Sequence, residues 1–156
     1  MTHGIRLTPQ RGSLLLEGLI GILLFSIGIL AVVALQGSAV KEVSQAKYRS
    51  DASFLADQLI GQIWANRTNA ATYAYNGSGT APTVLNSWMQ QVTARLPNSG
   101  SYPPKVAVTT TAYAGPPAYT AYQVKITLSW QTPEEYNSSP KPPPHSMAVS
   151  TVVTCC

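Results

Sequence analysis

The sequence predicts an α+β fold, in which a long N-terminal helix packs on a small antiparallel sheet of three or four strands. The run from Gly18 to Val40 contains no charged side chain, and apolar residues at helical spacing continue from it to Trp64. Short segments with alternating apolar and polar residues follow in the last third of the chain. A period near 3.6 indicates helix and a period of two indicates half-buried strands, so the helix comes first and the strands later.

The first half of the expected helix has the length of a membrane span. From Ser13 to Leu35 a helix would be about 34 Å long at about 1.5 Å per residue, which matches a bilayer core of about 30 Å. Arg6 and Arg11 precede this segment and no acidic residue does, as in membrane-targeting segments. We therefore expect a transmembrane segment at 13–39, with the N-terminus in the cytoplasm.

A cleaved secretory signal is the alternative for this segment, because Gly37, Ser38 and Ala39 would supply a cleavage site with small residues. The apolar core of such a signal spans about 7–15 residues. The run in this chain is longer and continues into an amphipathic pattern without a break. These two features favour a retained anchor.

The second half of the expected helix is amphipathic. Its apolar residues recur at intervals of three and four, and its charged residues occupy other faces. The apolar set is Val40, Val43, Ala52, Leu55, Ala56, Leu59, Ile60, Ile63 and Trp64. We therefore expect one helical spine over 13–66, whose second half packs its apolar stripe on a globular head at 67–156.

The beginning of the head is predicted as a loop and a short helix. The segment from Thr68 to Pro82 is rich in Asn, Gly, Ser and Pro, which is typical of loops. From Thr83 to Leu96 four large apolar residues share one helical face, and Pro97 ends the pattern.

The rest of the head is predicted as a sheet. Alternation marks strands around 106–108, 122–130 and 147–153. The segment 132–145 between the last two strands is too rich in proline for a sheet interior, and is predicted as a connection. Packing such a sheet on the spine is the economical arrangement.

One carboxylate, Glu17, lies near the start of the apolar run. An acid near a helix start stabilises its positive end, and Ser13 is a favoured N-cap residue. A capping box would place the acid one residue earlier, where Leu16 stands. The other interpretation is an ionic partner, because a charge inside a membrane costs a few kcal/mol and is usually paired.

The surrounding motif favours the ionic partner. Gly12, followed by Ser13-Leu14-Leu15-Leu16-Glu17 and a long apolar run behind a short basic leader, resembles the class III signal of type IV pilins and type II secretion pseudopilins. The resemblance implies that a prepilin peptidase cuts after Gly12 and that the new amine of Ser13 is methylated. It also implies that Glu17 pairs with the N-terminal amine of a neighbouring subunit. Ser13 stands where the family usually has Phe or Met.

The charges fit this resemblance. A cut after Gly12 would place an ammonium group on Ser13, four residues before the Glu17 carboxylate, so both would lie on one face of the helix. Each charge is poorly solvated in lipid, and each is a natural partner for the other.

The stretch GLIGILLFSIGILAVVALQ and the strand ending ITLSWQ further resemble minor pilins known as type IV pilus modification proteins. The resemblance implies a pilin-like fold with a leader at 1–12, and a minor pilin that primes or modifies pilus assembly. The implied partners are other pilins and minor pilins, the prepilin peptidase, the inner-membrane assembly platform and, before assembly, membrane lipid. The implied location is the inner membrane with a periplasmic head, and later the pilus on the cell surface.

Two other functions are open at this level. A minor pseudopilin of a type II secretion system would share the same N-terminal features. A membrane-anchored periplasmic adhesive or binding module would use the tyrosines in or near the predicted loops. These are Tyr73, Tyr75, Tyr102, Tyr113, Tyr119 and Tyr136.

No catalytic or metal-binding pattern occurs in the sequence. His3 lies in the leader and His145 in the Pro-rich connection, and neither has an evident acid or thiol partner. Glu134 and Glu135 have the features of ordinary loop surface. We therefore expect a protein that is not an enzyme and that binds no cofactor or metal. The formal charge of +4 becomes +2 without the leader, which does not favour nucleic acid as a partner.

The cysteines Cys155 and Cys156 are adjacent at the end of the chain. Adjacent cysteines bond to each other only in a strained ring. In an oxidising periplasm a disulfide between them, a link to another subunit and free thiols are the three alternatives.

Overall fold

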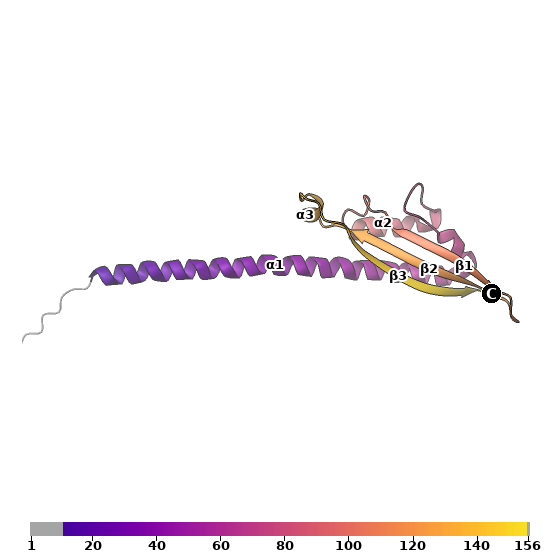
Figure 1. Ribbon diagram of the computed structural model, residues 1–156, viewed down its shortest axis with the longest axis horizontal. Helices are drawn as coiled ribbons and strands as arrows, with labels where there is room; N and C mark the ends of the chain where they lie inside the picture. Colours follow the sequence, from indigo (N-terminus) through magenta and orange to yellow (C-terminus); the bar gives the residue numbers. More distant parts are fainter. Residues whose placement is uncertain (1–10, 156) are drawn as a thin grey trace, which may run out of the picture. The chain divides into compact units, whose positions relative to one another are not determined.

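The structure, a computed structural model, describes residues 11–155, and their side chains from Leu14 onward. It is α+β, as the sequence predicts (Figure 1). In chain order the elements are α1 (Arg11–Ala65), η1 (Arg67–Tyr73), η2 (Thr83–Leu85), α2 (Asn86–Arg95), β1 (Lys105–Tyr113), β2 (Tyr119–Trp130), α3 (Pro133–Tyr136) and β3 (His145–Cys155). The chain divides into two compact units, of which the first ends at Ser44 and the second begins at Gln45.

The helix α1 is a single element of 55 residues, which confirms the predicted spine to within two residues at each end. It begins at Arg11, so Ser13 is not its N-cap residue. Its first turn contains no acidic residue, and Glu17 lies in the next turn. Because the field of a helix end falls off within the first turn, the capping interpretation of Ser13 and Glu17 is wrong.

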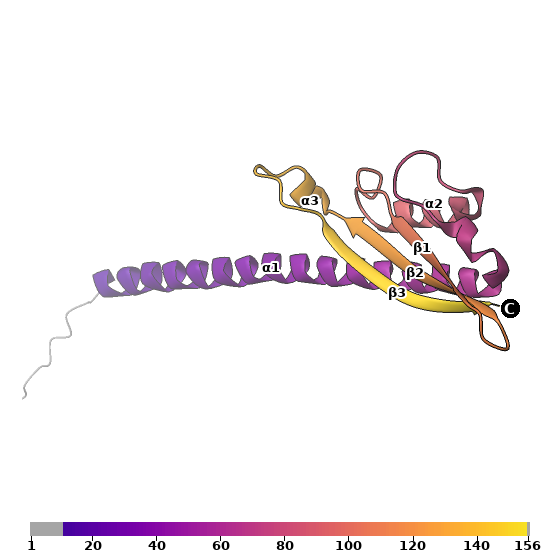
Figure 2. The ribbon, with the colours of Figure 1, turned by 45° about the vertical axis from the view of Figure 1, so that its right-hand side comes forward.

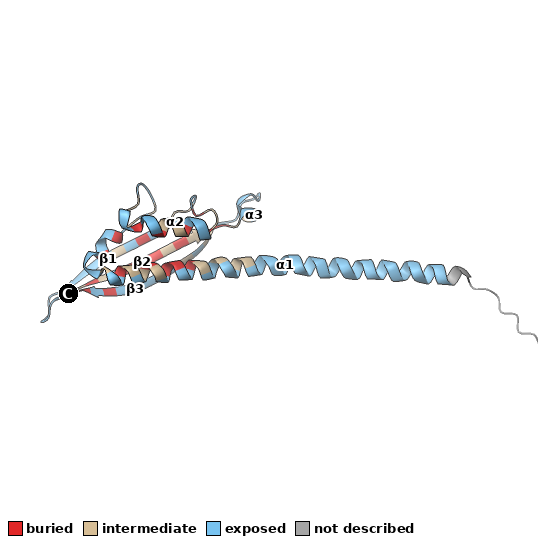
Figure 3. Ribbon diagram, turned by 180° about the vertical axis from the view of Figure 1, so that it is seen from behind, coloured by how far each residue is buried: buried red, intermediate tan, exposed pale blue. Residues whose placement is uncertain are grey.

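In the first unit every described side chain from Leu14 to Val43 is exposed (Figure 3). This part of α1 is long and apolar enough to cross a membrane, and its most apolar window has no buried share. The prediction of an apolar helix with the features of a membrane anchor is therefore confirmed at the level of length and composition.

In the second unit three antiparallel strands form one sheet in the order β1-β2-β3 (Figure 2). Val106 of β1 lies opposite Ile126 of β2, and Trp130 at the end of β2 lies opposite His145 at the start of β3. The central strand β2 buries every second residue over much of its length, as expected for a sheet with one face on a core.

The core of the second unit joins the second half of α1 to this sheet. Five α1 residues are fully buried, and they recur at intervals of three or four. Together with residues of the shorter helices and of the strands, the core comprises Ala52, Leu55, Ala56, Leu59, Ile63, Ala70, Tyr73, Leu85, Trp88, Val92, Leu96, Val106, Val124, Ile126, Leu128, Trp130 and Val153. The predicted packing of helix on sheet is therefore confirmed.

Three residues of the predicted stripe are exposed instead: Val40 at 65%, Val43 at 69% and Trp64 at 41%. Val40 and Val43 belong to the first unit, where no described side chain is buried. Trp64 directly follows the buried Ile63, and a step of one residue turns about 100° around a helix. It therefore lies off the face that Leu59 and Ile63 define.

The predicted short helix is observed as η2 and α2, and its apolar face lies in the core. Trp88 of α2 is fully buried, and its Nε1 donates a hydrogen bond to the carbonyl oxygen of Leu55 at 2.8 Å. A buried tryptophan usually finds such an acceptor for its N–H. This bond ties α2 to the buried half of α1.

The predicted loop after Arg67 is partly helical, which corrects the sequence prediction. The 3₁₀ helix η1 occupies Arg67–Tyr73 and buries Ala70 and Tyr73. Farther on, Tyr75 exchanges two backbone hydrogen bonds with Val106, at 2.8 and 2.7 Å. Burial of apolar side chains therefore orders a segment whose composition is typical of loops.

Candidate functional site

The predicted assembly residues lie at the beginning of α1. Gly12 and Ser13 fall within its first turn, and their side chains lie outside those described. The leader residues 1–10, with His3, lie outside the described residues too. Glu17 is exposed, and it forms no ion pair with any residue that the structure describes.

Around Glu17 the first half of α1 presents a continuous apolar surface. Burying one Leu, Ile, Val or Phe side chain is worth roughly 1.5–3 kcal/mol, and exposed patches of this kind mark membrane or protein interfaces. Its large exposed residues are Leu14, Leu15, Leu16, Leu19, Ile20, Ile22, Leu23, Leu24, Phe25, Ile27, Ile29, Leu30, Val32, Val33, Leu35, Val40 and Val43. A surface of this kind is typical of segments that lipid or other apolar chains cover.

A polar cluster, which we call the Glu135 cluster, joins Gln45, Glu135 and His145. Oε1 of Glu135 lies 3.0 Å from Nε2 of Gln45 and 2.9 Å from Nε2 of His145. Because an ionised carboxylate only accepts hydrogen bonds, both nitrogens donate to this oxygen. The 3.1 Å between the two nitrogens is then a close approach of two donors.

The second oxygen of Glu135 caps α3. Its Oε2 accepts from the backbone N–H of Thr132 at 3.0 Å, while the Thr132 hydroxyl accepts from the N–H of Glu135 at 3.3 Å. These two bonds form a capping box. Desolvation raises the pKa of Glu135, but hydrogen bonds from His145 and Thr132 outweigh it and hold the pKa below the ordinary value of 4.5.

Beside the Glu135 cluster lies a cleft of about 510 Å³, which we call the Arg49 cleft. It is lined by Gln45, Ala46, Arg49, Trp130, His145 and Ser146. The ring of Trp130 stacks on that of His145 with centroids 6.0 Å apart. Trp130 is 2% exposed, and its Nε1 has no hydrogen-bond partner among the described residues. A buried donor left unpaired costs about 1–3 kcal/mol.

The Glu135 cluster corrects two sequence interpretations. His145 begins β3 rather than lying in a loop, and it has an acid partner in Glu135. Glu135 is therefore not ordinary surface. Thr132 followed by Glu135 is the capping-box spacing, so the sequence held a signal for α3. The pairing with Gln45, 90 positions away, had no local signal.

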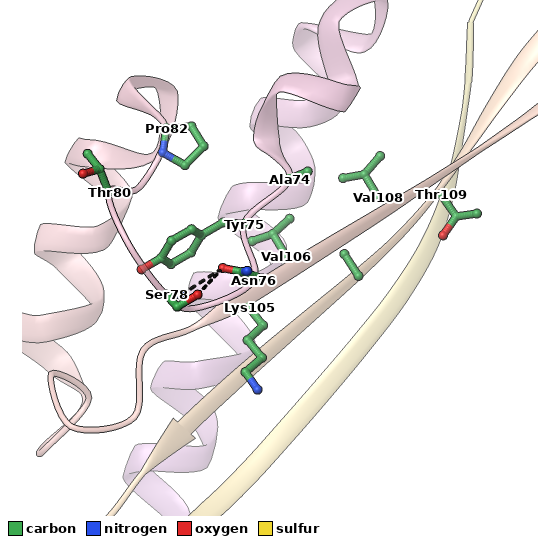
Figure 4. A pocket seen from close by; sticks show the side chains of 11 residues that line it. Ala74, Tyr75, Asn76, Ser78, Thr80, Pro82, Lys105, Val106, Val108 and Thr109 are labelled. Carbon is green, nitrogen blue, oxygen red and sulfur yellow. Dashed lines mark hydrogen bonds between the residues drawn. The ribbon is translucent and has the colours of Figure 1, made fainter.

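A second hollow, of about 780 Å³, lies along β1 (Figure 4). Tyr75 and Asn76 line it from one side, and Lys105, Val106 and Val108 from the strand. The Asn76 side chain accepts two hydrogen bonds from the backbone and hydroxyl of Ser78, at 3.0 and 2.9 Å. These bonds hold the turn itself, and no hydrogen bond among the described residues joins the lining hydroxyls of Ser78 or Thr80 to Lys105.

The loop tyrosines do not form one surface. Tyr73 is buried. Tyr113 and Tyr119 stack at 4.6 Å where β1 meets β2, whereas Tyr136 lies on α3 after the other end of β2. The ammonium of Lys141 lies 3.4 Å from the ring centroid of Tyr136, a cation–π contact that fixes the Pro-rich segment.

The remaining candidate groups are limited. Among residues 11–155 no group of three or more His, Cys, Asp or Glu side chains is placed to hold a metal ion. Cys155 is 8% exposed at the end of β3 and is disulfide-bonded. Cys156 lies outside the described residues, so its pairing stays a prediction.

Comparison of the chain with protein-family models, with curated proteins and with solved structures finds no match.

Proposed function

We propose that this protein is a minor pilin, a structural subunit that primes or modifies the assembly of a type IV pilus. Its role is mechanical rather than catalytic. The apolar half of α1 spans the inner membrane before assembly, with the head in the periplasm, and it later packs among the helices of other pilins. The observation that carries the proposal is the lone carboxylate of Glu17, four residues after Ser13 in an exposed apolar helix.

The physical reason for this carboxylate is pairing with a new chain end. A charged side chain in the bilayer centre costs about 3 kcal/mol even on insertion scales. Cleavage after Gly12 leaves an ammonium group on Ser13, which is equally unfavourable in an apolar filament core. A neighbouring subunit satisfies both groups when its N-terminus meets Glu17. Apolar packing then supplies affinity, and the ion pair supplies the axial register.

The test substitutes Glu17→Gln and measures incorporation of the full chain into sheared pili, with membrane abundance measured beside it. Glu42→Gln is the matched control, because Glu42 is also an exposed carboxylate of α1 but lies beyond the apolar run. We expect E17Q to accumulate in the membrane and to fall about tenfold or more in pili, since losing a buried ion-pair partner costs about 3–5 kcal/mol. E42Q should assemble normally.

A second variant separates a pilin from a permanent anchor. Gly12→Val should leave the leader attached and exclude the chain from pili, whereas Gly18→Val should be processed. If E17Q and E42Q enter pili equally, the pairing role of Glu17 is wrong. If Gly12→Val retains full function at full length, the chain is an anchored module instead.

A further inference from the structure

The charges around the Arg49 cleft are one-sided. Arg49 and His145 are the basic side chains of its lining, and no acidic side chain lines it. Arg49 is exposed and forms no ion pair with any described residue. Glu135, which contacts the lining residues Gln45 and His145, already uses both oxygens, on those two residues and on the capping box of α3. Arg49 therefore places in the cleft a positive charge that forms no ion pair with a described acidic side chain.

The neutral groups of the cleft add donors rather than acceptors. Trp130 can only donate through Nε1, which is buried and unpaired among the described residues. The Ser146 hydroxyl forms no hydrogen bond with the described residues and can turn to donate. Buried polar groups are normally hydrogen-bonded, so an unpaired donor on a residue that lines a cleft calls for an explanation.

We propose that the Arg49 cleft binds a carboxylate, supplied by an acidic side chain of a partner polypeptide. The planar guanidinium of Arg49 matches the two oxygens of a carboxylate in a bidentate pair. The Ser146 hydroxyl supplies a further donor at the wall. Under the proposed function, that polypeptide is another subunit of the filament. Only the identity of the partner rests on the proposed function.

Charge complementarity is what assigns an acidic partner. The second unit has its own exposed carboxylates, Asp57 and Glu134, but neither pairs with Arg49 within the described chain. A cleft of about 510 Å³ has room for a Glu or Asp side chain. Its basic lining repels a lysine or arginine side chain, so the same groups that attract an acid also provide specificity.

The experiment follows the indole N–H resonance of Trp130 in the full chain, labelled with ¹⁵N and held in zwitterionic micelles. The resonance is assigned with Trp130→Phe. The probe is N-acetyl-Ala-Glu-Ala-amide, and N-acetyl-Ala-Gln-Ala-amide at equal ionic strength is its control. We expect a saturable shift with the glutamate peptide and none with the glutamine peptide.

Two substitutions test the role of Arg49. Arg49→Gln should weaken binding about tenfold or more, because a hydrogen bond to a charged group is worth about 1.5–3 kcal/mol. Arg67→Gln removes another exposed arginine, outside the cleft, and should leave the binding curve unchanged. An unchanged thermal transition in both variants shows that the head is folded.

Three results would overturn the proposal. An equal response to both peptides, or binding by R49Q as tight as that of the wild type, would show that the cleft does not recognise a carboxylate through Arg49. Binding of acetate as tight as that of the peptide would show that the ligand is not a partner polypeptide. Tighter binding of inorganic phosphate would show that the ligand is a phosphate rather than a carboxylate. Each result concerns the isolated chain, so it leaves the assembly test of Glu17 untouched.

Discussion

The two halves of α1 are both rich in apolar residues, but they find apolar surroundings in different places. Leu55 in the second half is fully buried against α2 and the sheet, whereas Leu23 in the first half is 60% exposed. The second half alternates apolar and charged faces, so one face can enter a core while another meets water. The first half is apolar all round, which is the pattern of a helix covered on every side.

Charges differ between the halves in the same way. In the second half Asp51 lies 3.9 Å from Arg95, with side chains 22% and 46% exposed, and the Arg95 guanidinium lies 4.9 Å from the ring centroid of Phe54. Such an exposed pair is worth little. Glu17 in the first half has no partner among the described residues. One half therefore packs within its own chain, whereas the apolar surface and the carboxylate of the other half have no partner among the described residues.

The largest expected effect is on the free energy of unfolding of the head, and it is tested by one substitution in each half of α1. Leu55→Ala removes a fully buried side chain and should lower the free energy of unfolding of the head by about 2–5 kcal/mol. Leu23→Ala, its matched control, should leave that free energy unchanged within about 0.5 kcal/mol. Denaturation followed by tryptophan fluorescence in micelles measures both values. An equal loss in the two variants would mean that the first half also belongs to the head's cooperative unit.

The smaller expected effect concerns the Glu135 cluster, where the second half of α1 begins to contact the head. The Glu135 side chain is 27% exposed. Solvent screening therefore limits its contribution to the stability of the fold to about 1 kcal/mol or less. Because the pKa of Glu135 is lowered in the folded state, ionised Glu135 stabilises the fold fully above its unfolded value of about 4.5. This contribution is lost as the pH falls through the lowered pKa.

Thermal melting at pH 7 and at pH 3 tests this sign. Glu135→Gln should lower the melting temperature of the head at pH 7 and have a smaller effect at pH 3, where a larger share of the wild-type carboxyl is protonated. Glu134→Gln, which alters the exposed neighbour, should change neither value appreciably. A loss in E135Q that grows with acidity would show that the carboxylate does not stabilise the fold.

Periodicity predicted the fold because it reports which face of each element is buried. The five buried α1 residues and the alternation along β2 are visible in the sequence. Composition failed where tertiary contacts override it: the predicted loop after Arg67 became η1, since Ala70 and Tyr73 enter the core. The prediction that Trp64 belongs to the buried stripe of α1 was wrong. Spacing by three and four residues defined that stripe too broadly.

The candidate sites also differ in whether the sequence could predict them. Glu17 could be selected from the sequence because a carboxylate in an apolar run is anomalous within a single segment. The Glu135 cluster and the Arg49 cleft could not, because their side chains come from α1, α3 and the ends of β2 and β3. Only the register that places Trp130 opposite His145 brings these side chains together.

The most direct test of the central claim is the intact mass of the native protein isolated from membranes and pili. We expect the mature protein to begin at Ser13, with residues 1–12 absent and with one added methyl group on the new amine. A chain that retains its first twelve residues in pili, or one that begins near Val40 after signal cleavage, would contradict the account.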